Sequence, residues 1–301
     1  MSDHQLLLIV LILANLALFF FLYWRPRKKR KNEEKGLFFD SLKGPIFYQI
    51  NGGRNKETIL LIHGLGASAY CWRKVVPLLE EDYRVVSFDL WGFGKSSKET
   101  LLDMDIDEHV QIIEDLLDFL NIDKIHVVGN SMGAHIGLWF AKQRPDRVDK
   151  VVAISPAAYP KLVPQYIRRM KWISNWTPWV INHNFIRGML INVLGNPHNI
   201  DTEMVEAYME PYLDPKAHTS FAASLRVIED ERVFNSLNTI DKPVLTLWGE
   251  RDRVIPRKVI NKIVAQLPYV ELKTHPKSGH CPMEEHPDWC AENIVSFLKS
   301  R

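Results

Sequence analysis

The sequence contains few cysteines and no pattern of them that suits a metal. Cys71, Cys281 and Cys290 are odd in number and widely spaced. Neither a disulfide framework nor a zinc site with paired thiolates is therefore expected. Unpaired thiols fit a reducing compartment. The chain also lacks internal repeats and low-complexity tracts, and we expect it to need no cofactor and no metal.

A strong excess of one charge is also absent. The 301 residues carry a formal net charge of +2, and outside residues 1–31 there are 32 basic and 35 acidic residues. This mildly acidic balance excludes a general nucleic-acid partner. Hydrophobic residues make up 46% of the chain, enough for the core of one α/β domain with an insertion.

The exception to this even composition is an apolar run near the start of the chain. Residues 6–24 are all apolar except Asn15, and at about 1.5 Å per residue such a helix covers most of a bilayer's hydrocarbon thickness. Basic residues follow the run over 25–31, the reverse of a cleaved signal peptide. We therefore expect a transmembrane anchor over 6–24 and a basic linker over 25–36. A buried helix of the main domain is the alternative.

The positive flank after the run predicts the orientation. Basic residues next to a membrane span remain on the cytoplasmic side of the membrane. We therefore expect a single-pass membrane protein with its main domain on that side. The basic cluster suits anionic lipid headgroups, and a nuclear localisation signal is the alternative reading of it.

Strand-like and helix-like patterns alternate along the rest of the chain. Strands are predicted over 37–50 (a pair), 58–62, 83–88, 124–128, 150–154, 243–248 and 270–273, and helices over 106–120, 134–141, 257–266 and 289–299. This alternation predicts an α/β fold with a mainly parallel sheet and helices on both faces. The stretch 157–226 breaks the alternation and is too long for a bare loop. We expect it to be a helical cap inserted between two core segments, 37–156 and 227–301.

The most informative stretch is the turn between a predicted strand and a predicted helix at 129–133, Gly-Asn-Ser-Met-Gly. A serine between two glycines on such a turn is held in a strained backbone conformation that exposes its hydroxyl. The first amides of the following helix attract negative charge there. We expect Ser131 to be a nucleophile. An ordinary serine in a tight turn is the alternative.

A serine nucleophile needs a base, and the base needs an orienting acid. Of the 11 histidines, His280 lies just past the last predicted strand and is the predicted base. His63 lies in a glycine-rich loop better suited to presenting amides. His135 lies in the helix after the serine.

Asp252 is the predicted acid, because it follows the strand that ends near residue 248. Glu250 and Asp241 are its rivals, and a salt bridge with a neighbouring arginine is the alternative role for Asp252. The order serine, acid, histidine is the one expected for a nucleophile on a strand-to-helix turn.

The tetrahedral intermediate requires hydrogen-bond donors for its oxyanion. The amide of Met132, directly after the nucleophile, is one predicted donor. Leu65, in the loop His63-Gly64-Leu65-Gly66 after an earlier strand, is the other. Each such donor lowers a barrier by about 3–4 kcal/mol in well-studied enzymes.

Together these residues closely resemble the α/β-hydrolase superfamily. The resemblance covers about residues 44–156 and 227–300. It rests on His63–Gly66, Asp89–Ser96, Gly129–Gly133, Gly249–Pro256, and Gly279-His280 followed by Glu285 and Pro287. It implies Ser131 as nucleophile, Asp252 as acid, His280 as base, and Leu65 with Met132 as the oxyanion hole. Epoxide hydrolases and haloalkane dehalogenases of this superfamily carry aspartate at the nucleophile position of this strand-to-helix turn, which is called the elbow. Ser131 argues against both. Ala134, where many relatives have glycine, leaves the chemistry unchanged.

The predicted cap is basic and rich in tryptophan. Residues 157–200 contain no acid, and Trp172, Trp176 and Trp179 fall within eight positions. Residues 163–173 combine an apolar face with basic residues opposite, which suits a membrane interface. Caps also turn an apolar face toward an active site, and the two roles are compatible.

With the predicted anchor, this arrangement resembles membrane-anchored monoacylglycerol lipases of the superfamily. The resemblance implies a carboxylic ester hydrolase that takes lipid esters, such as monoacylglycerols, from the bilayer and forms an acyl-enzyme on Ser131. Two alternatives stay open. One is a carbon–carbon bond hydrolase or small-ester carboxylesterase, since similar Gly-Asn-Ser-Met-Gly elbows occur in those branches. The other is a catalytically silent interaction protein on the same fold.

Overall fold

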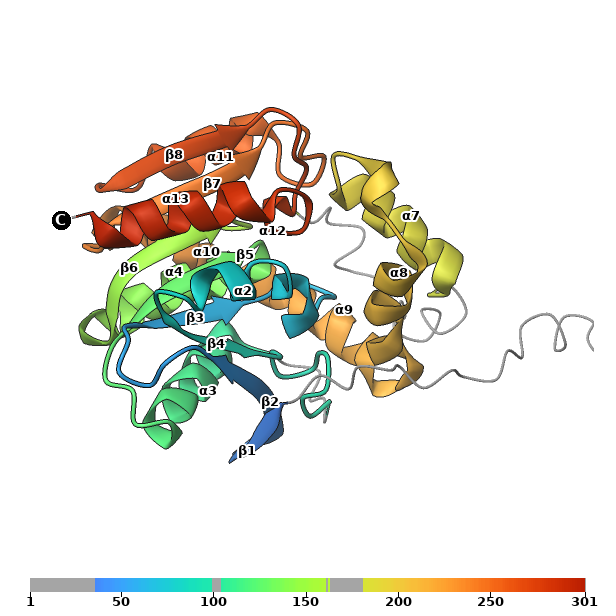
Figure 1. Cartoon of the computed structure of the whole chain (residues 1–301), viewed down its shortest axis with the longest axis horizontal. Helices are drawn as coiled ribbons and strands as arrows, with labels where there is room; N and C mark the ends of the chain where they lie inside the picture. Colours follow the sequence, from blue (N-terminus) through green and yellow to red (C-terminus); the bar gives the residue numbers. More distant parts are fainter. Residues whose placement is uncertain (1–35, 99–103, 161, 163–180, 301) are drawn as a thin grey trace, which may run out of the picture. The chain divides into compact units, whose positions relative to one another are not determined.

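Eight strands form the central sheet of the computed structural model, which describes residues 36–98, 104–160, 162 and 181–300. Their spatial order is β1-β2-β4-β3-β5-β6-β7-β8 (Figure 1). The strands are β1 (Leu37–Ser41), β2 (Gly44–Asn51), β3 (Thr58–Ile62), β4 (Arg84–Phe88), β5 (Ile125–Asn130), β6 (Val148–Ile154), β7 (Val244–Gly249) and β8 (Val270–His275). Strand β2 pairs antiparallel with both β1 and β4. The remaining neighbours in this order, from β4 through β3, β5, β6 and β7 to β8, pair in parallel. The predicted mainly parallel sheet is confirmed.

Helices cover both faces of this sheet because successive strand residues point to opposite sides. In β3, Leu60 and Ile62 pack with helices α3 and α4, whereas Ile59 and Leu61 pack on the other face with α2 and α13. Strands buried on both faces explain the unbroken apolar runs in the sequence. The helices of the core are α2 (Val76–Leu79), α3 (Ile106–Phe119), α4 (Met132–Gln143), α10 (Glu231–Ser236), α11 (Arg257–Val264), α12 (Pro282–Glu285) and α13 (Pro287–Lys299).

A group of helices lies between β6 and β7 in the chain. These are α7 (His183–Val193), α8 (Thr202–Met209) and α9 (Lys216–Ile228), with the short 3₁₀ turn η4 (Glu210–Leu213) between the last two. Figure 1 shows them gathered at one end of the sheet. Helix α9 runs two residues past the boundary predicted at 226. Residues 161 and 163–180 of the predicted cap, including its amphipathic stretch, lie outside the described residues.

The predicted membrane placement requires a correction. Within residues 36–98, 104–160, 162 and 181–300, no helix is long and apolar enough to cross a membrane. The longest of them, α3, has 14 residues and extends only about 21 Å at about 1.5 Å per residue, short of the roughly 30 Å of a hydrocarbon core. The predicted anchor over 6–24 and residues 25–35 of the linker predicted over 25–36 lie outside the described residues. The assignment as a single-pass membrane protein with a cytoplasmic catalytic domain, drawn from that apolar run alone, is therefore withdrawn.

Candidate active site

The turn that carries Ser131 joins β5 directly to α4. Ser131 has φ 54° and ψ −115°, a conformation that costs a side-chain-bearing residue about 1–3 kcal/mol. The flanking glycines are required by space. A Cβ at Gly129 would lie 2.4 Å from the carbonyl oxygen of Gly133, and a Cβ at Gly133 would lie 2.1 Å from that of Ile62. The predicted strained elbow is therefore present.

Backbone hydrogen bonds hold this strained turn in place. The Ser131 amide donates to the carbonyl of Ile154 at 2.9 Å, and its own carbonyl accepts from the amides of His135 and Ala157, each at 3.1 Å. Helix α4 begins at Met132, so the Met132 amide has no partner within the helix. The elbow thus presents a helix N-terminus next to the serine.

The loop after β3 passes directly beside the elbow. A Cβ at Gly64 would lie 3.2 Å from the Cβ of Ser131, so the missing side chain allows the loop to come this close. Gly66 has φ +72°, which glycine adopts without strain. The backbone at Gly64, the residue before Leu65, is therefore next to the serine.

His63 orients this loop. Its Nε2 accepts from the Leu90 amide at 2.9 Å, so Nδ1 carries the proton and donates to the carbonyl of Gly64 at 2.8 Å. Burial lowers the pKa of His63 to about 4, which keeps the ring neutral near pH 7. Because a trans peptide is planar, fixing the Gly64 carbonyl toward His63 turns the next amide, that of Leu65, away from it. His63 positions amides and is not the base.

His280 and Asp252 meet beyond the carboxyl end of β7. Nδ1 of His280 lies 2.9 Å from Oδ2 of Asp252. The other carboxylate oxygen, Oδ1, accepts from the amides of Val254 at 2.7 Å and Ile255 at 2.9 Å. The Asp252 side chain is fully buried. Both of its oxygens are thus engaged, which fixes the carboxylate behind the imidazole ring.

The backbone of His280 is held from two sides. Its amide donates to the carbonyl of Val193, at the end of α7, at 2.7 Å. Its carbonyl accepts from Nδ2 of Asn130 at 3.1 Å. Asn130 immediately precedes Ser131, so one buried side chain joins the elbow to the histidine loop. The structure therefore brings Ser131, His280 and Asp252 to the same end of the sheet.

The rival residues lie elsewhere. Glu250 is exposed and accepts from the hydroxyl of Thr274 at 2.9 Å. Asp241 is exposed and lies 3.8 Å from the ammonium of Lys242. His135 is buried within α4, and burial lowers its pKa to about 4. Of the three acids considered, only Asp252 contacts His280.

Sequence reasoning missed the role of Glu285. Its Oε2 accepts from the amides of Gly195 at 2.8 Å and Asn196 at 3.1 Å, and its Oε1 accepts from the amide of Gly279 at 2.7 Å. This carboxylate joins the segment after α7 to the residue before His280. A Cβ at Gly279 would lie 2.3 Å from the amide nitrogen of Gly195, so the two backbones touch. The only signal in the sequence was the position of Glu285 in the segment that resembles the superfamily.

The preceding residue, Glu284, makes a second tie to the cap. It is buried, with Nη1 of Arg73 at 2.6 Å from Oε1 and the hydroxyl of Tyr208, from α8, donating to the same oxygen at 3.1 Å. Lys74 donates to the Glu284 carbonyl at 2.8 Å. The short helix α12, which follows His280, is therefore anchored to both the core and α8.

Aromatic cap residues lie against the loop after β3. A Cβ at Gly66 would lie 2.8 Å from the hydroxyl of Tyr212 and 3.3 Å from the ring of Phe221. Burial raises the pKa of Tyr212 above its usual range, so the phenol stays neutral. The helical segment between β6 and β7 thus places the hydroxyl of Tyr212 and the ring of Phe221 against Gly66, in the loop that holds Leu65.

No group of three or more histidine, cysteine, aspartate or glutamate side chains suited to a metal ion occurs among the residues that the structure describes. Cys71, Cys281 and Cys290 are all buried free thiols. Burial raises the pKa of each of these thiols, which disfavours the nucleophilic thiolate form. Serine chemistry is what the arrangement supports.

Residues 57–287 match the family model described as alpha/beta hydrolase fold. Among curated proteins, the chain is 29% identical over 267 residues to "Uncharacterized hydrolase YugF" from Bacillus subtilis (strain 168), covering 84% of this chain and 94% of that one. It is 28% identical over 257 residues to "2-hydroxy-6-oxononadienedioate/2-hydroxy-6-oxononatrienedioate hydrolase 1" from Pseudomonas putida, covering 82% and 89%.

Solved structures share the fold. One of them, "Crystal structure of a membrane phospholipase A, a novel bacterial virulence factor", superimposes with a TM-score of 0.74 at 25% identity and covers 99% of this chain and 98% of that one.

Proposed function

This chain belongs to the α/β-hydrolase fold family, and we propose that it is a serine hydrolase that works through an acyl-enzyme. The observation that carries the proposal is the buried Asp252–His280 contact of 2.9 Å at the same end of the sheet as the strained Ser131. Ser131 is the nucleophile, His280 the general base, and Asp252 the group that orients His280. The amides of Leu65 and Met132 form the oxyanion hole.

The reaction begins at a carbonyl carbon of the substrate. Oγ of Ser131 adds to that carbon while Nε2 of His280 takes the hydroxyl proton, and the buried Asp252 carboxylate stabilises the imidazolium that results. The carbonyl oxygen becomes an oxyanion that the Leu65 and Met132 amides stabilise. His280 then gives its proton to the leaving group. In the second half of the reaction, water attacks the acyl-serine while His280 takes a proton from it, and His280 returns that proton to Oγ of Ser131 as the acid product leaves.

The relatives favour a carbon–carbon bond hydrolase. The Pseudomonas putida relative is named for a 2-hydroxy-6-oxo dienedioate, and further curated relatives at 26–29% identity carry that name. In such a substrate the enol first becomes its keto tautomer, with the 2-hydroxyl proton moving to the carbon next to the 6-oxo group. After Ser131 adds to the 6-oxo carbon, the carbon–carbon bond breaks, its electron pair passes through the conjugated system to the 2-oxo group, and His280 protonates the resulting dienolate. A 2-hydroxy-6-oxo-dienoate is therefore the first substrate class that we assign to Ser131.

A carboxylic ester is the second substrate class, with lipid esters such as monoacylglycerols included. The likeness to a phospholipase A over 99% of this chain supports it. The apolar surface of Tyr212 and Phe221 over the loop after β3 is compatible with an acyl chain. The same acyl-enzyme forms, and the leaving group is an alcohol.

One substrate panel separates the two classes. Purified protein is given a 2-hydroxy-6-oxo-dienoate, whose absorbance is lost on cleavage, then a long-chain monoacylglycerol and p-nitrophenyl butyrate. We expect the dienoate to give the highest kcat/KM. A higher kcat/KM for either ester would assign the ester class instead.

Ser131→Ala tests the mechanism under both classes. We expect it to lower kcat by at least about 10⁴-fold on the best substrate, with Ser155→Ala as a control for the loss of another buried serine hydroxyl. Labelling by a fluorophosphonate probe should require Ser131. Retained hydrolysis in Ser131→Ala would refute the mechanism, and a wild-type protein that neither labels nor hydrolyses any of the three would favour a catalytically silent protein.

A further inference from the structure

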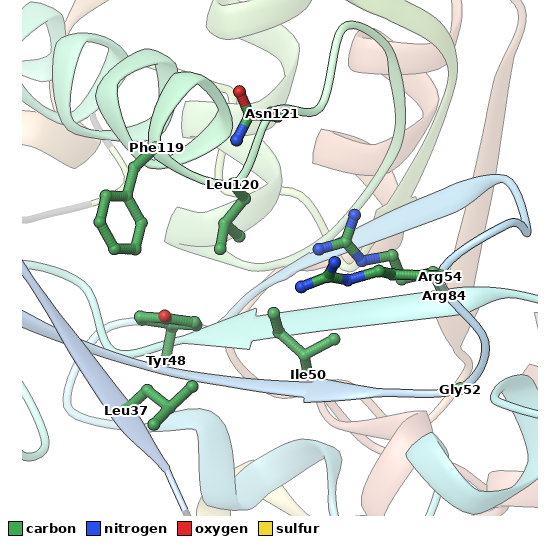
Figure 2. A pocket seen from close by; sticks show the side chains of 9 residues that line it. All are labelled: Leu37, Tyr48, Ile50, Gly52, Arg54, Arg84, Phe119, Leu120 and Asn121. Carbon is green, nitrogen blue, oxygen red and sulfur yellow. The ribbon is translucent and has the colours of Figure 1, made fainter.

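A pocket lies beside β2 and includes Arg84 at the amino end of β4, whereas Ser131 follows the carboxyl end of β5. It has a volume of ≈ 460 Å³ and is formed by β2, the turn after it, the first residue of β4 and the end of α3 (Figure 2). Arg84 begins β4, a strand about 13 Å long at about 3.3 Å per residue. Leu90, whose amide donates to His63, follows the other end of this strand. The volume of the pocket is within the usual range for small-molecule sites.

One side of this pocket is apolar and exposed. Ile50 of β2 is 36% exposed, Leu37 of β1 is 58% exposed, and Phe119 at the end of α3 is 54% exposed. Figure 2 shows these side chains and Leu120 around the same hollow. Single exposed apolar residues are ordinary, but several around one pocket are typical of a binding surface.

The other side carries two guanidinium groups. Figure 2 shows those of Arg54 and Arg84 side by side, extended toward Leu120 and Ile50. Arg84 is only 8% exposed, and its Nε is buried without a hydrogen-bond partner. Within the described residues, neither arginine forms an ion pair with a carboxylate. Two like charges therefore share a partly apolar pocket.

This arrangement is unfavourable unless something else occupies the pocket. Burial and the neighbouring Arg54 charge both lower the pKa of Arg84, yet a guanidinium stays charged in proteins. An unpartnered buried donor is unfavourable, and more so when it is charged. A carboxylate or phosphate would accept from both guanidinium groups and offset their repulsion.

We propose that this pocket binds an amphipathic anion, with its oxyanion head between Arg54 and Arg84 and its hydrocarbon tail along Ile50, Leu120 and Phe119. The ligand class is a carboxylate or phosphate monoester on a medium-length aliphatic chain. The site is separate from Ser131 and does not depend on which bond the enzyme cleaves.

Calorimetric titration of the full-length protein tests this site, using octanoate, octyl phosphate, octanol and inorganic phosphate at low ionic strength. We expect saturable binding of octanoate, octyl phosphate or both, at least about tenfold tighter than that of octanol or of inorganic phosphate. Whichever of octanoate and octyl phosphate binds more tightly identifies the head group. Affinity should rise at least about tenfold from butanoate to octanoate, because the added methylenes become buried. Equal binding of octanol, or of free phosphate, would overturn the proposal, as would no binding at all.

Arg84→Met identifies the site, because it removes the charge and keeps most of the apolar stem. It should weaken binding of the acid at least about tenfold and leave kcat/KM at Ser131 unchanged. Arg54→Met, at an exposed position, is the second variant should Arg84→Met fold poorly, and the same loss is expected. Lys258→Met removes an exposed cation on α11 and should change nothing. Unchanged affinity in both arginine variants would place the ligand elsewhere, the active site included, and overturn the proposal.

Discussion

The two ends of the sheet treat their charged groups in opposite ways. At the carboxyl end, the carboxylate of Asp252 contacts His280 and two amides, and that of Glu285 accepts from three amides. At the amino end, Arg54 and Arg84 face one pocket with no carboxylate paired to either among the described residues.

We infer that the paired charges at the carboxyl end hold catalytic groups in position, whereas the unpaired charges at the amino end can bind a ligand. A charge whose hydrogen bonds are all made within the chain is rigid, and it holds catalytic groups in place before the substrate arrives. A charge whose bonds are unmade has capacity left for a ligand. Variants at the two ends of the sheet test this distinction.

Asp252→Asn should break the positioning at the carboxyl end. The amide oxygen can keep the bonds from Val254 and Ile255, but its NH₂ then faces Nδ1 of His280 and favours the wrong tautomer. We expect kcat to fall about 10⁴-fold with little change in folding. Steady-state kinetics on the best substrate measure this, with Asp241→Asn at the exposed rival position as control. A loss below tenfold would show that Asp252 is not the orienting acid.

Glu285→Gln should weaken the tie between the cap segment and the histidine loop. One of the two oxygens becomes an NH₂ that faces a backbone amide, so at least one charge-assisted hydrogen bond is lost. We expect kcat/KM to fall about tenfold or more, mostly through kcat, because His280 loses its position. Glu250→Gln, an exposed carboxylate in the loop before Asp252, is the matched control. A change in KM alone would assign Glu285 to substrate binding instead.

His109 sharpens the comparison, because it too is buried without a partner. Both of its ring nitrogens lack hydrogen bonds, and burial lowers its pKa from 6.5 to about 4. Unlike Arg84, it can remain uncharged. The unfolded chain binds a proton near pH 6.5 while the folded one does not until about pH 4, so stability is present above pH 6.5 and is lost as the pH falls toward 4.

His109→Leu should therefore flatten the pH dependence of stability. The shift of His109 alone removes about 2 kcal/mol of unfolding free energy between pH 7 and pH 5. Urea unfolding at both pH values measures it, and the variant should lose about that much less than wild type. His198→Leu, at an exposed position, should leave the difference as it is. An equal loss in wild type and His109→Leu would mean that His109 is charged or solvated in the folded protein.

Arg84→Met should have the smallest effect on the protein without ligand. It removes a buried charge that Arg54 repels, so we expect the free energy of unfolding to rise by up to about 1 kcal/mol at low salt. An ordinary ion-paired arginine would give a loss. Urea unfolding with and without octanoate checks both states, since a ligand that binds only the folded protein should stabilise wild type alone.

Much of the fold could be predicted because its signals are local. The strand predicted over 58–62 and the helix predicted over 106–120 were found at β3 and α3. The glycines around Ser131 indicated a strained turn, and the structure shows the backbone clashes that require them. Strand ends shifted by one or two residues, because pairing with neighbours sets where a strand stops.

The membrane prediction was wrong, although its signal was local too. It rested on hydropathy within one segment, without any contact from the rest of the chain to test it. None of the helices in the described part of the chain can span a bilayer. The pocket at Arg54 and Arg84 was missed because its residues come from β1, β2, the turn after β2, the start of β4, and the end of α3 with the two residues that follow it. No pattern within any one of these segments is unusual.

The sequence alone indicated the alternating strands and helices, the turn at Ser131 and the candidate residues Asp252 and His280, because each signal consists of residue types within a few positions of one another. It did not indicate that Asp252 and not Glu250 lies behind His280, that His63 orients amides, or that Glu285 ties the segment after α7 to the histidine loop. Those outcomes depend on which groups meet across long stretches of chain, where hydrogen-bond geometry and burial select one partner from several that are chemically alike.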